Sequence, residues 1–350
     1  MSSSAAHLVE RVLPDQTLRQ WVATFPQPLP RLLAWRPKLL AKLLADQSRV
    51  IQEDLRRRTG EPTGRTGMIS FVQNFTGDLR CFVHIHALVP DGVFVEHRQD
   101  IHFVPAPIPT KRDIQAVTEA LAERVRRSCA RWQRRLAPTE EDRAAERLDL
   151  LAGLGEEHVR GPRRRSSGRP TAHHRRWLGT HLGVQLHAGV TAARGDTRGR
   201  ERLARYVARP ALCLKRIYEQ DDGWLLVQFK RPWRNGTSGV RLEPSVFVLR
   251  LASLVMPAKV NLIRYHGVFA PASPWRSRVV PVPPEAPVSR RHARWIHWAK
   301  LMQHVFGRSD ACPQCGQTMT YKGSLDPKRA AEVLFWIDVA GDLIEPGEPP

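Results

Sequence analysis

Two histidines, His84 and His86, stand two positions apart within the apolar segment Cys81–Val89. In a β-strand such residues lie on one face, with Cα atoms about 6.6 Å apart. Both imidazoles can then bind one metal ion at about 2.1 Å. Because unpartnered polar groups are costly to bury, the alternative is that the two histidines form hydrogen bonds with neighbouring side chains. The local sequence is compatible with either interpretation.

A tyrosine in a basic segment is the second feature that could do chemistry. Tyr206 is one of only four tyrosines, and it lies near Arg205 and Arg209 in a segment, 199–208, whose pattern predicts a helix that ends before Pro210. A phenol with a pKa near 10 attacks a phosphate at neutral pH only when a metal ion or another cation activates it. The alternative is an amphipathic tyrosine at the edge of the core.

The composition favours a nucleic-acid partner. The 350 residues include 55 Lys and Arg against 34 Asp and Glu, which gives a formal net charge of +21. Most of this excess is arginine, whose planar guanidinium suits phosphate, although a generally basic surface is the alternative. The sequence has no apolar stretch near the roughly 20 residues of a membrane helix. Five cysteines and an N-terminus without signal-peptide features argue against a secreted, disulfide-rich protein.

Hydrophobic spacing and turn residues predict an α+β protein. Residues 5–57 have leucines at helical spacing, and 111–136 has a long amphipathic pattern. Segments 68–75 and 81–89, joined through Thr76-Gly77-Asp78, predict a β-hairpin that carries both histidines. We therefore expect a central antiparallel sheet covered by helices. Three regions are predicted: a helical N-terminal region at 1–60, a catalytic domain at 61–280 with a basic linker at 155–198, and a C-terminal helical region at 281–350.

Two further groups of residues are candidate ligands. Cys312 and Cys315 have the spacing of a zinc knuckle, and His304 lies upstream as a third candidate ligand for Zn²⁺. Structural zinc takes four ligands, so a pair of free thiols is the alternative. Arginines that flank Tyr206, lie in the basic segment 160–176 or follow Trp233 are expected to contact nucleic-acid phosphates. They are Arg205, Arg209, Arg163, Arg164, Arg165, Arg175, Arg176 and Arg234.

Several segments, taken in order, resemble one family. They are His84-Ile85-His86, residues 203–214 with Tyr206, Thr17-Leu18-Arg19-Gln20-Trp21, Phe71-Val72-Gln73-Asn74-Phe75, Trp233-Arg234-Asn235-Gly236-Thr237, residues 262–271 and Cys312-Pro313-Gln314-Cys315-Gly316. Over most of residues 5–340 the chain resembles the HUH-type rolling-circle transposases of the insertion-sequence-91 family. Members often carry a Cys-rich zinc module before the segment corresponding to residue 5, so the resemblance implies a shortened copy. Some relatives have a second tyrosine four residues after the first, where this chain has Pro210.

The resemblance implies an activity and a role for each residue. HUH enzymes hold Mg²⁺ or Mn²⁺ through two histidines, here His84 and His86, and a third polar ligand, for which we expect Gln73. The tyrosine, here Tyr206, attacks a phosphate of single-stranded DNA and stays linked to the 5′ end. The implied function is nicking and joining of single-stranded or hairpin DNA at element ends in rolling-circle transposition.

The partners and location follow from that function. We expect DNA as the partner, no membrane and no small-molecule substrate, and a cytoplasmic protein that associates with the nucleoid through DNA. The main alternative is a catalytically inactive, truncated DNA-binding remnant that regulates a full-length copy. An RNA-binding protein that uses the same charge without cleavage is a second alternative.

Overall fold

A computed structural model describes residues 2–98, 100–133, 156–160, 176–233, 235–257 and 260–281 of the chain. All of these residues belong to one unit, Met1–Ala286. The C-terminal helical region predicted at 281–350, with its Cys-x-x-Cys pair, lies outside the described residues apart from Pro281. Within the described ranges, no helix is long and apolar enough to cross a membrane.

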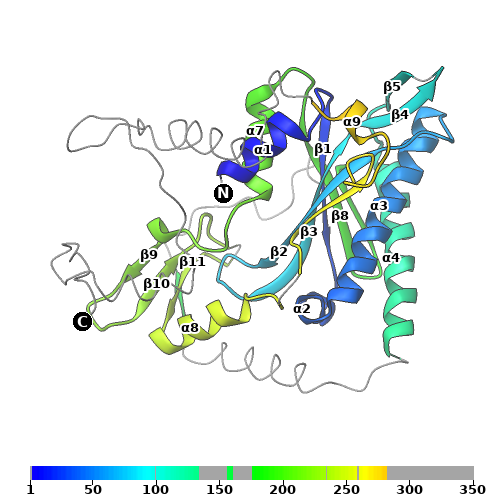
Figure 1. Ribbon diagram of the computed structural model, residues 1–350. Coiled ribbons are helices and arrows are strands. Elements are labelled where there is room, and N and C mark those ends of the chain that lie inside the picture. Colours follow the sequence, from blue (N-terminus) through cyan, green and yellow to red (C-terminus); the bar gives the residue numbers. More distant parts are fainter. Residues whose placement is uncertain are drawn as a thin grey trace, which may run out of the picture. The chain divides into compact units, whose positions relative to one another are not determined.

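The centre of the unit is a six-stranded sheet in which every neighbouring pair of strands is antiparallel (Figure 1). Two neighbouring strands of this sheet, β2 and β3, form the hairpin predicted from the turn at residues 76–80. In spatial order the strands are β12 (Ile263–Gly267), β2 (Gly67–Phe75), β3 (Cys81–Pro90), β1 (Leu18–Thr24), β8 (Val184–Ala192) and β7 (Leu178–His181).

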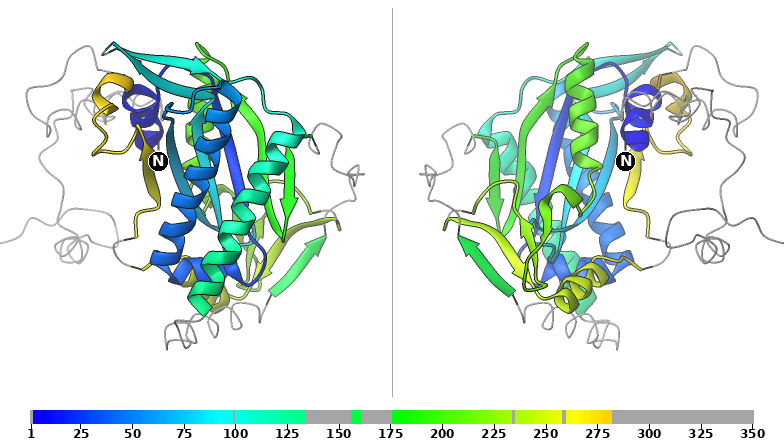
Figure 2. Two further views of the ribbon diagram at one scale, coloured as in Figure 1. Left: turned by 90° about the vertical axis from the view of Figure 1, so that its right-hand side faces the viewer. Right: turned by 90° about the vertical axis from the view of Figure 1, so that its left-hand side faces the viewer.

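Helices cover both faces of this sheet (Figure 2). Residues of alternate parity on β3, such as Ile85 and Leu88, pack into two different cores, as strand geometry requires. One face packs against α2 (Leu29–Trp35), α3 (Pro37–Thr59) and α4 (Lys111–Gln133). The other face packs against α1 (Ser2–Arg11), α7 (Thr197–Val207) and the short α9 (Arg276–Val279). The fold is thus α+β with a helix-covered antiparallel sheet, which confirms the predicted class.

Two smaller sheets complete the described part. One is the hairpin of β4 (Gly92–His97) and β5 (Asp100–Pro105). The other has four strands, with α8 (Pro244–Ser253) beside it, and its core includes Leu79 from the turn of the β2–β3 hairpin. Its strands, in spatial order, are β6 (Glu156–Arg160), β11 (Thr237–Leu242), β10 (Leu225–Gln228) and β9 (Ile217–Glu219), and the turn η1 (Leu214–Arg216) precedes β9.

Two of the predicted regions are corrected by the strands. The N-terminal region 1–60 is not wholly helical, because β1 lies in the middle of the sheet between β3 and β8. The segment 155–198 is not simply a linker, because it contributes β6, β7 and β8. β1 is buried on both faces and therefore lacks the alternation of polar and apolar residues that identifies a half-buried strand. Residues 161–175 of the predicted linker lie outside the described residues.

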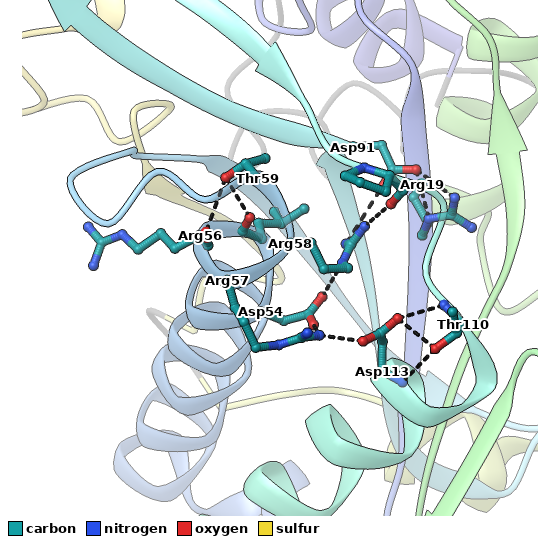
Figure 3. Close-up of polar contacts among 11 residues, drawn as sticks. Arg19, Asp54, Arg56, Arg57, Arg58, Thr59, Asp91, Thr110 and Asp113 are labelled. Carbon is teal, nitrogen blue, oxygen red and sulfur yellow. Dashed lines mark hydrogen bonds and ion pairs between the residues drawn. The ribbon is translucent and has the colours of Figure 1, made fainter.

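A chain of ion pairs joins α3, α4 and the sheet (Figure 3). Asp54 accepts hydrogen bonds from Arg57 (2.8 Å) and from Arg58 (2.7 Å). Arg57 also pairs with Asp113, which caps the start of α4 by accepting from the backbone N–H and the hydroxyl of Thr110. The Arg58 side chain is 4% exposed, so this pairing compensates a charge that the fold has removed from water.

Candidate active site

Three polar side chains lie together on the sheet face that packs against α7. His84 and His86 have the same strand parity as Leu88, and Gln73 has the same parity as Phe71 on β2. The register pairs Gln73 directly with His84 across the two strands. The His84 and His86 ring centroids are 4.9 Å apart. The hairpin thus brings together the two histidines and the glutamine that the sequence indicated.

Each histidine has one ring nitrogen, Nδ1, within hydrogen-bonding distance of a neighbouring group. His84 Nδ1 lies 3.2 Å from the carbonyl oxygen of Phe82, an acceptor that requires the proton on Nδ1. His86 Nδ1 lies 2.8 Å from the amide nitrogen of Gln20 on β1. His86 Nε2 is buried and has no hydrogen-bond partner among the described residues. A buried nitrogen without a partner is an unusual feature that a bound ligand would explain.

Both imidazoles are held neutral by their surroundings. Burial, together with the neighbouring His84 and Arg209, lowers the pKa of His86 to about 3. Burial also lowers the pKa of His84, assisted by Arg209 and opposed by the hydrogen bond to Phe82. At neutral pH both rings therefore keep a lone pair, which is the form that binds a metal ion.

Helix α7 places Tyr206 over the two histidines. The helix begins at Asp196, whose side chain accepts a hydrogen bond from the backbone N–H of Gly199 at 2.8 Å. Leu203, Ala204 and Val207 form its buried stripe against the sheet. Tyr206 lies in the last turn and remains 42% exposed, with its ring centroid 5.7 Å from that of His86. The phenol is therefore near the imidazoles and accessible to a large substrate.

Gln73 connects the sheet to the end of this helix. Its amide nitrogen donates to the carbonyl oxygen of Val207 at 2.9 Å and lies 3.5 Å from that of Tyr206. Because both partners are acceptors, this orientation of the amide is chemically determined. The other end of the amide, Gln73 Oε1, is buried and has no hydrogen-bond partner among the described residues. One side chain can thus hold the last turn of α7 and offer an oxygen to a ligand.

A guanidinium completes the group of side chains around Tyr206. The Arg209 guanidinium carbon lies 5.0 Å from the Tyr206 ring centroid and 5.6 Å from that of Phe75. Phe75 in turn makes an edge contact with His84, at 6.5 Å between centroids. The positive charge of Arg209 lies where it can attract a phosphate beside the phenol.

The donor set fits a divalent cation. Two imidazoles and one amide oxygen supply neutral nitrogen and oxygen ligands of the kinds that such ions accept. Two of the atoms concerned, His86 Nε2 and Gln73 Oε1, are buried polar atoms that lack hydrogen bonds. In the described part of the chain, no group of three or more His, Cys, Asp or Glu is arranged to hold a metal ion.

The other side chains predicted to contact DNA or to bind zinc lie apart from this site or outside the described residues. Arg205 is exposed and pairs with Glu201 on α7. Arg176 is exposed and stacks over Trp177, which packs against the core under α3 and α4 rather than beside Tyr206. Five predicted DNA contacts and the three zinc candidates lie outside the described residues: Arg163, Arg164, Arg165, Arg175, Arg234, His304, Cys312 and Cys315.

Sequence reasoning did not identify Gln20 as a site residue. It is 2% exposed and contacts His86 from the neighbouring strand β1, which the sequence pattern assigned to a helical region. The signal that could have found it is the segment Thr17–Trp21, which the resemblance included without a role. Once β1 is placed beside β3, Gln20 has the parity of Leu18 and faces the site.

The comparisons with known proteins bear on this group of residues. A search of curated proteins and a search of solved structures found no match. Residues 67–277, more than half of the chain, match a protein-family model described as "Putative transposase". The match runs from β2 to the start of α9 and includes His84, His86 and Tyr206. The chain belongs to this family of transposases.

Proposed function

We propose that this transposase cleaves and rejoins single-stranded DNA through a covalent bond to Tyr206, with Mg²⁺ or Mn²⁺ held by His84, His86 and Gln73. The observation that carries the proposal is the convergence of the nucleophile and the ligands: the Tyr206 ring lies 5.7 Å from the ring of His86, whose Nε2 is buried and unpartnered. The resemblance to HUH-type rolling-circle transposases supports the same assignment.

The bonds that form and break in the reaction involve only Tyr206 and the DNA. The Tyr206 oxygen attacks the scissile phosphorus, and the bond from phosphorus to the 3′ oxygen breaks. The phenolic proton is lost to solvent and the departing 3′ oxygen takes up a proton, so a 5′-phosphotyrosine and a free 3′-OH are formed. A 3′-OH can later attack the phosphotyrosine, which restores the phenol and joins the strands. The ester conserves the phosphodiester energy, so joining needs no nucleotide.

The side chains have separate tasks in this scheme. Arg209, over the Tyr206 ring, offsets the charge of the incoming phosphate. Gln73 fixes the last turn of α7, which keeps the phenol in place. A divalent ion, when bound, would polarise the scissile phosphate. The 42% exposure of Tyr206 leaves room for the nucleotides on both sides of the cleaved bond.

The test is the formation of a covalent adduct. A 3′-labelled single-stranded element end, incubated with the protein and Mn²⁺, should give a protein-linked band on a denaturing gel, and peptide mapping should identify Tyr206. Tyr206→Phe removes one hydroxyl and should abolish the band. Tyr218→Phe is the matched control, because Tyr218 is similarly exposed at 46% but lies on β9 and donates to the carbonyl of Lys215. An adduct on another residue would reassign the nucleophile.

A second arm tests the metal ligands. His84→Ala and His86→Ala should each remove Mn²⁺ binding in calorimetric titration and abolish the adduct. Normal Mn²⁺ binding in the double variant would overturn the ligand assignment. If the wild-type chain forms no adduct with any divalent ion and still binds DNA, the inactive DNA-binding remnant becomes the better description.

A further inference from the structure

The turn between β10 and β11 carries an exposed aromatic side chain among cations. Lys230 and Arg231 are exposed, and Trp233 follows them with 39% of its surface accessible. The chain has ten tryptophans. Most large aromatic side chains in a folded protein are buried, because burial removes their apolar surface from water. An indole left accessible beside two positive charges therefore requires an explanation.

The Trp233 ring is held rigidly. It stacks on Phe229 at 4.8 Å between centroids with an interplanar angle of 26°, and it lies 5.4 Å from the His158 ring of β6. The backbone is fixed as well, since Trp233 N–H donates to Thr237 O (2.7 Å) and Gly236 N–H donates to Trp233 O (3.0 Å). Gly236 has φ +87°, a conformation that favours glycine and closes the turn. The indole is thus a preorganised surface.

Packing connects this turn to the end of the β2–β3 hairpin that carries the site. Phe229, under Trp233, shares a buried cluster with Leu79 in the hairpin turn. At the base of that turn Phe75 pairs with Cys81, and Phe75 contacts the His84 ring. The hairpin turn thus packs against the small sheet whose β10–β11 turn carries Trp233, and Phe75 at the base of the hairpin turn contacts His84.

We propose that Trp233 is a stacking platform for an unpaired base of single-stranded DNA, and that Lys230 and Arg231 contact the phosphates next to that base. Stacking on an aromatic ring needs a free base face, which a duplex does not offer, and positive charge beside the ring suits the backbone. The choice of DNA rests on the proposed function, whereas the platform itself is a separate binding subsite outside the cleavage chemistry.

The experiment measures binding without cleavage. The full-length chain carrying Tyr206→Phe is titrated in EDTA against a fluorescently labelled oligonucleotide, single-stranded or as a duplex of the same sequence, by anisotropy. Trp233→Ala should weaken binding of the single strand between about 5-fold and 150-fold and leave the duplex unaffected. Trp233→Phe should retain most of the affinity, because any aromatic ring can stack.

Controls separate the platform from general damage. Trp224→Ala is matched, because Trp224 directly precedes β10 of the same small sheet and is stacked by Arg241 (5.1 Å), and it should bind as the parent does. Lys230→Ala with Arg231→Ala should reduce the slope of log affinity against log salt by about 1.4. All variants should keep the parent's melting temperature within a few degrees.

The failures of the two proposals are distinguishable. The platform is overturned if Trp233→Ala lowers the affinity for single strand and duplex equally, or lowers neither. It is also overturned if Trp233→Phe binds the single strand as weakly as Trp233→Ala does. If Trp233→Ala weakens single-strand binding but the chain with Tyr206 never forms a tyrosine adduct, the platform is supported and the proposed cleavage chemistry is rejected.

Discussion

Two buried glutamines differ in how firmly their amides are oriented. Gln73 faces two carbonyl oxygens and must present its NH₂ group to them, which leaves its oxygen for the site. Gln20 faces Nδ1 of His86, a nitrogen that donates in one tautomer and accepts in the other. When His86 Nε2 binds a metal, Nδ1 carries the proton and the Gln20 oxygen must accept it. In that state the Gln20 amide, turned so that its oxygen faces Nδ1, stabilises the ligating tautomer.

This role predicts the behaviour of three variants in Mn²⁺ titrations of the Tyr206→Phe chain. Gln20→Leu removes the acceptor and should weaken Mn²⁺ binding about 10-fold to 100-fold. Gln20→Glu supplies a carboxylate acceptor and should bind Mn²⁺ at least as tightly as the parent. Gln228→Leu, at an exposed glutamine of β10, is the control and should change nothing. Parent-like binding by Gln20→Leu would contradict the assignment.

His266 on the edge strand β12 gives a pH-dependent contribution to stability. Burial, assisted by Arg264, lowers the pKa of His266 to about 4, and its Nε2 lies 3.1 Å from the hydroxyl of Ser70. The ordinary value of 6.5 applies to the unfolded chain, so between pH 6.5 and 4 the unfolded state binds more protons. Stability must therefore fall as the pH falls through this range.

The measurement is urea unfolding of the parent and of His266→Gln from pH 7.5 to pH 4. The variant cannot take up the proton, so its free energy of unfolding should depend less on pH. The difference in slope should reach at most about 1.4 kcal/mol per pH unit. Identical slopes for the two chains would show that His266 does not titrate differently in the two states.

At the scale of elements, the ion-pair chain holds α3 against α4 and the sheet. Asp54→Ala removes one of the two carboxylates that pair with Arg57 and leaves Arg58, only 4% exposed, with Asp91 at 3.7 Å as its remaining carboxylate. We expect a loss of about 3 kcal/mol in the free energy of unfolding, since a buried charge then loses its closest partner. Glu123→Ala breaks the exposed pair with Arg126 and should cost less than about 1 kcal/mol. If both variants lost the same free energy of unfolding in urea titrations, the stabilising role of the buried network would be contradicted.

The elements that could be predicted are those with a local signal. The β2–β3 hairpin has two apolar segments around a turn, α4 has an amphipathic stripe, and α7 ends before Pro210. The strands β1 and β8 were not predicted. β1 is buried on both faces and pairs with a strand about 165 residues further along the chain, and neither property leaves a local pattern in the sequence. The same reason explains the site: His84, His86 and Tyr206 have recognisable types and settings, whereas Gln20 acquires its role only from that pairing.

At the scale of the whole molecule, the sheet extends beyond the region that matches the family model. The match begins at residue 67, yet β1 lies between β3 and β8 and contributes Leu18, Trp21 and Ala23 to the cores on both faces. Each of these three side chains is at most 1% exposed. Without β1, two long strands lose their hydrogen-bonding partner in the middle of the sheet, and the exposed edges favour aggregation.

The chain 61–286, which retains the predicted catalytic domain, should therefore fail to fold, whereas 1–286 should fold. The truncated chain lacks the central strand, α1 and α3, and with them much of the apolar burial that offsets the loss of chain entropy. Circular dichroism during urea titration should give a cooperative transition for 1–286 and none for 61–286. Only 1–286 should bind Mn²⁺, because Gln20 and the partner strand of His86 are present in it alone. A cooperative transition and parent-like Mn²⁺ binding by 61–286 would mean that the family region folds by itself, with β1 added to a sheet that is already complete.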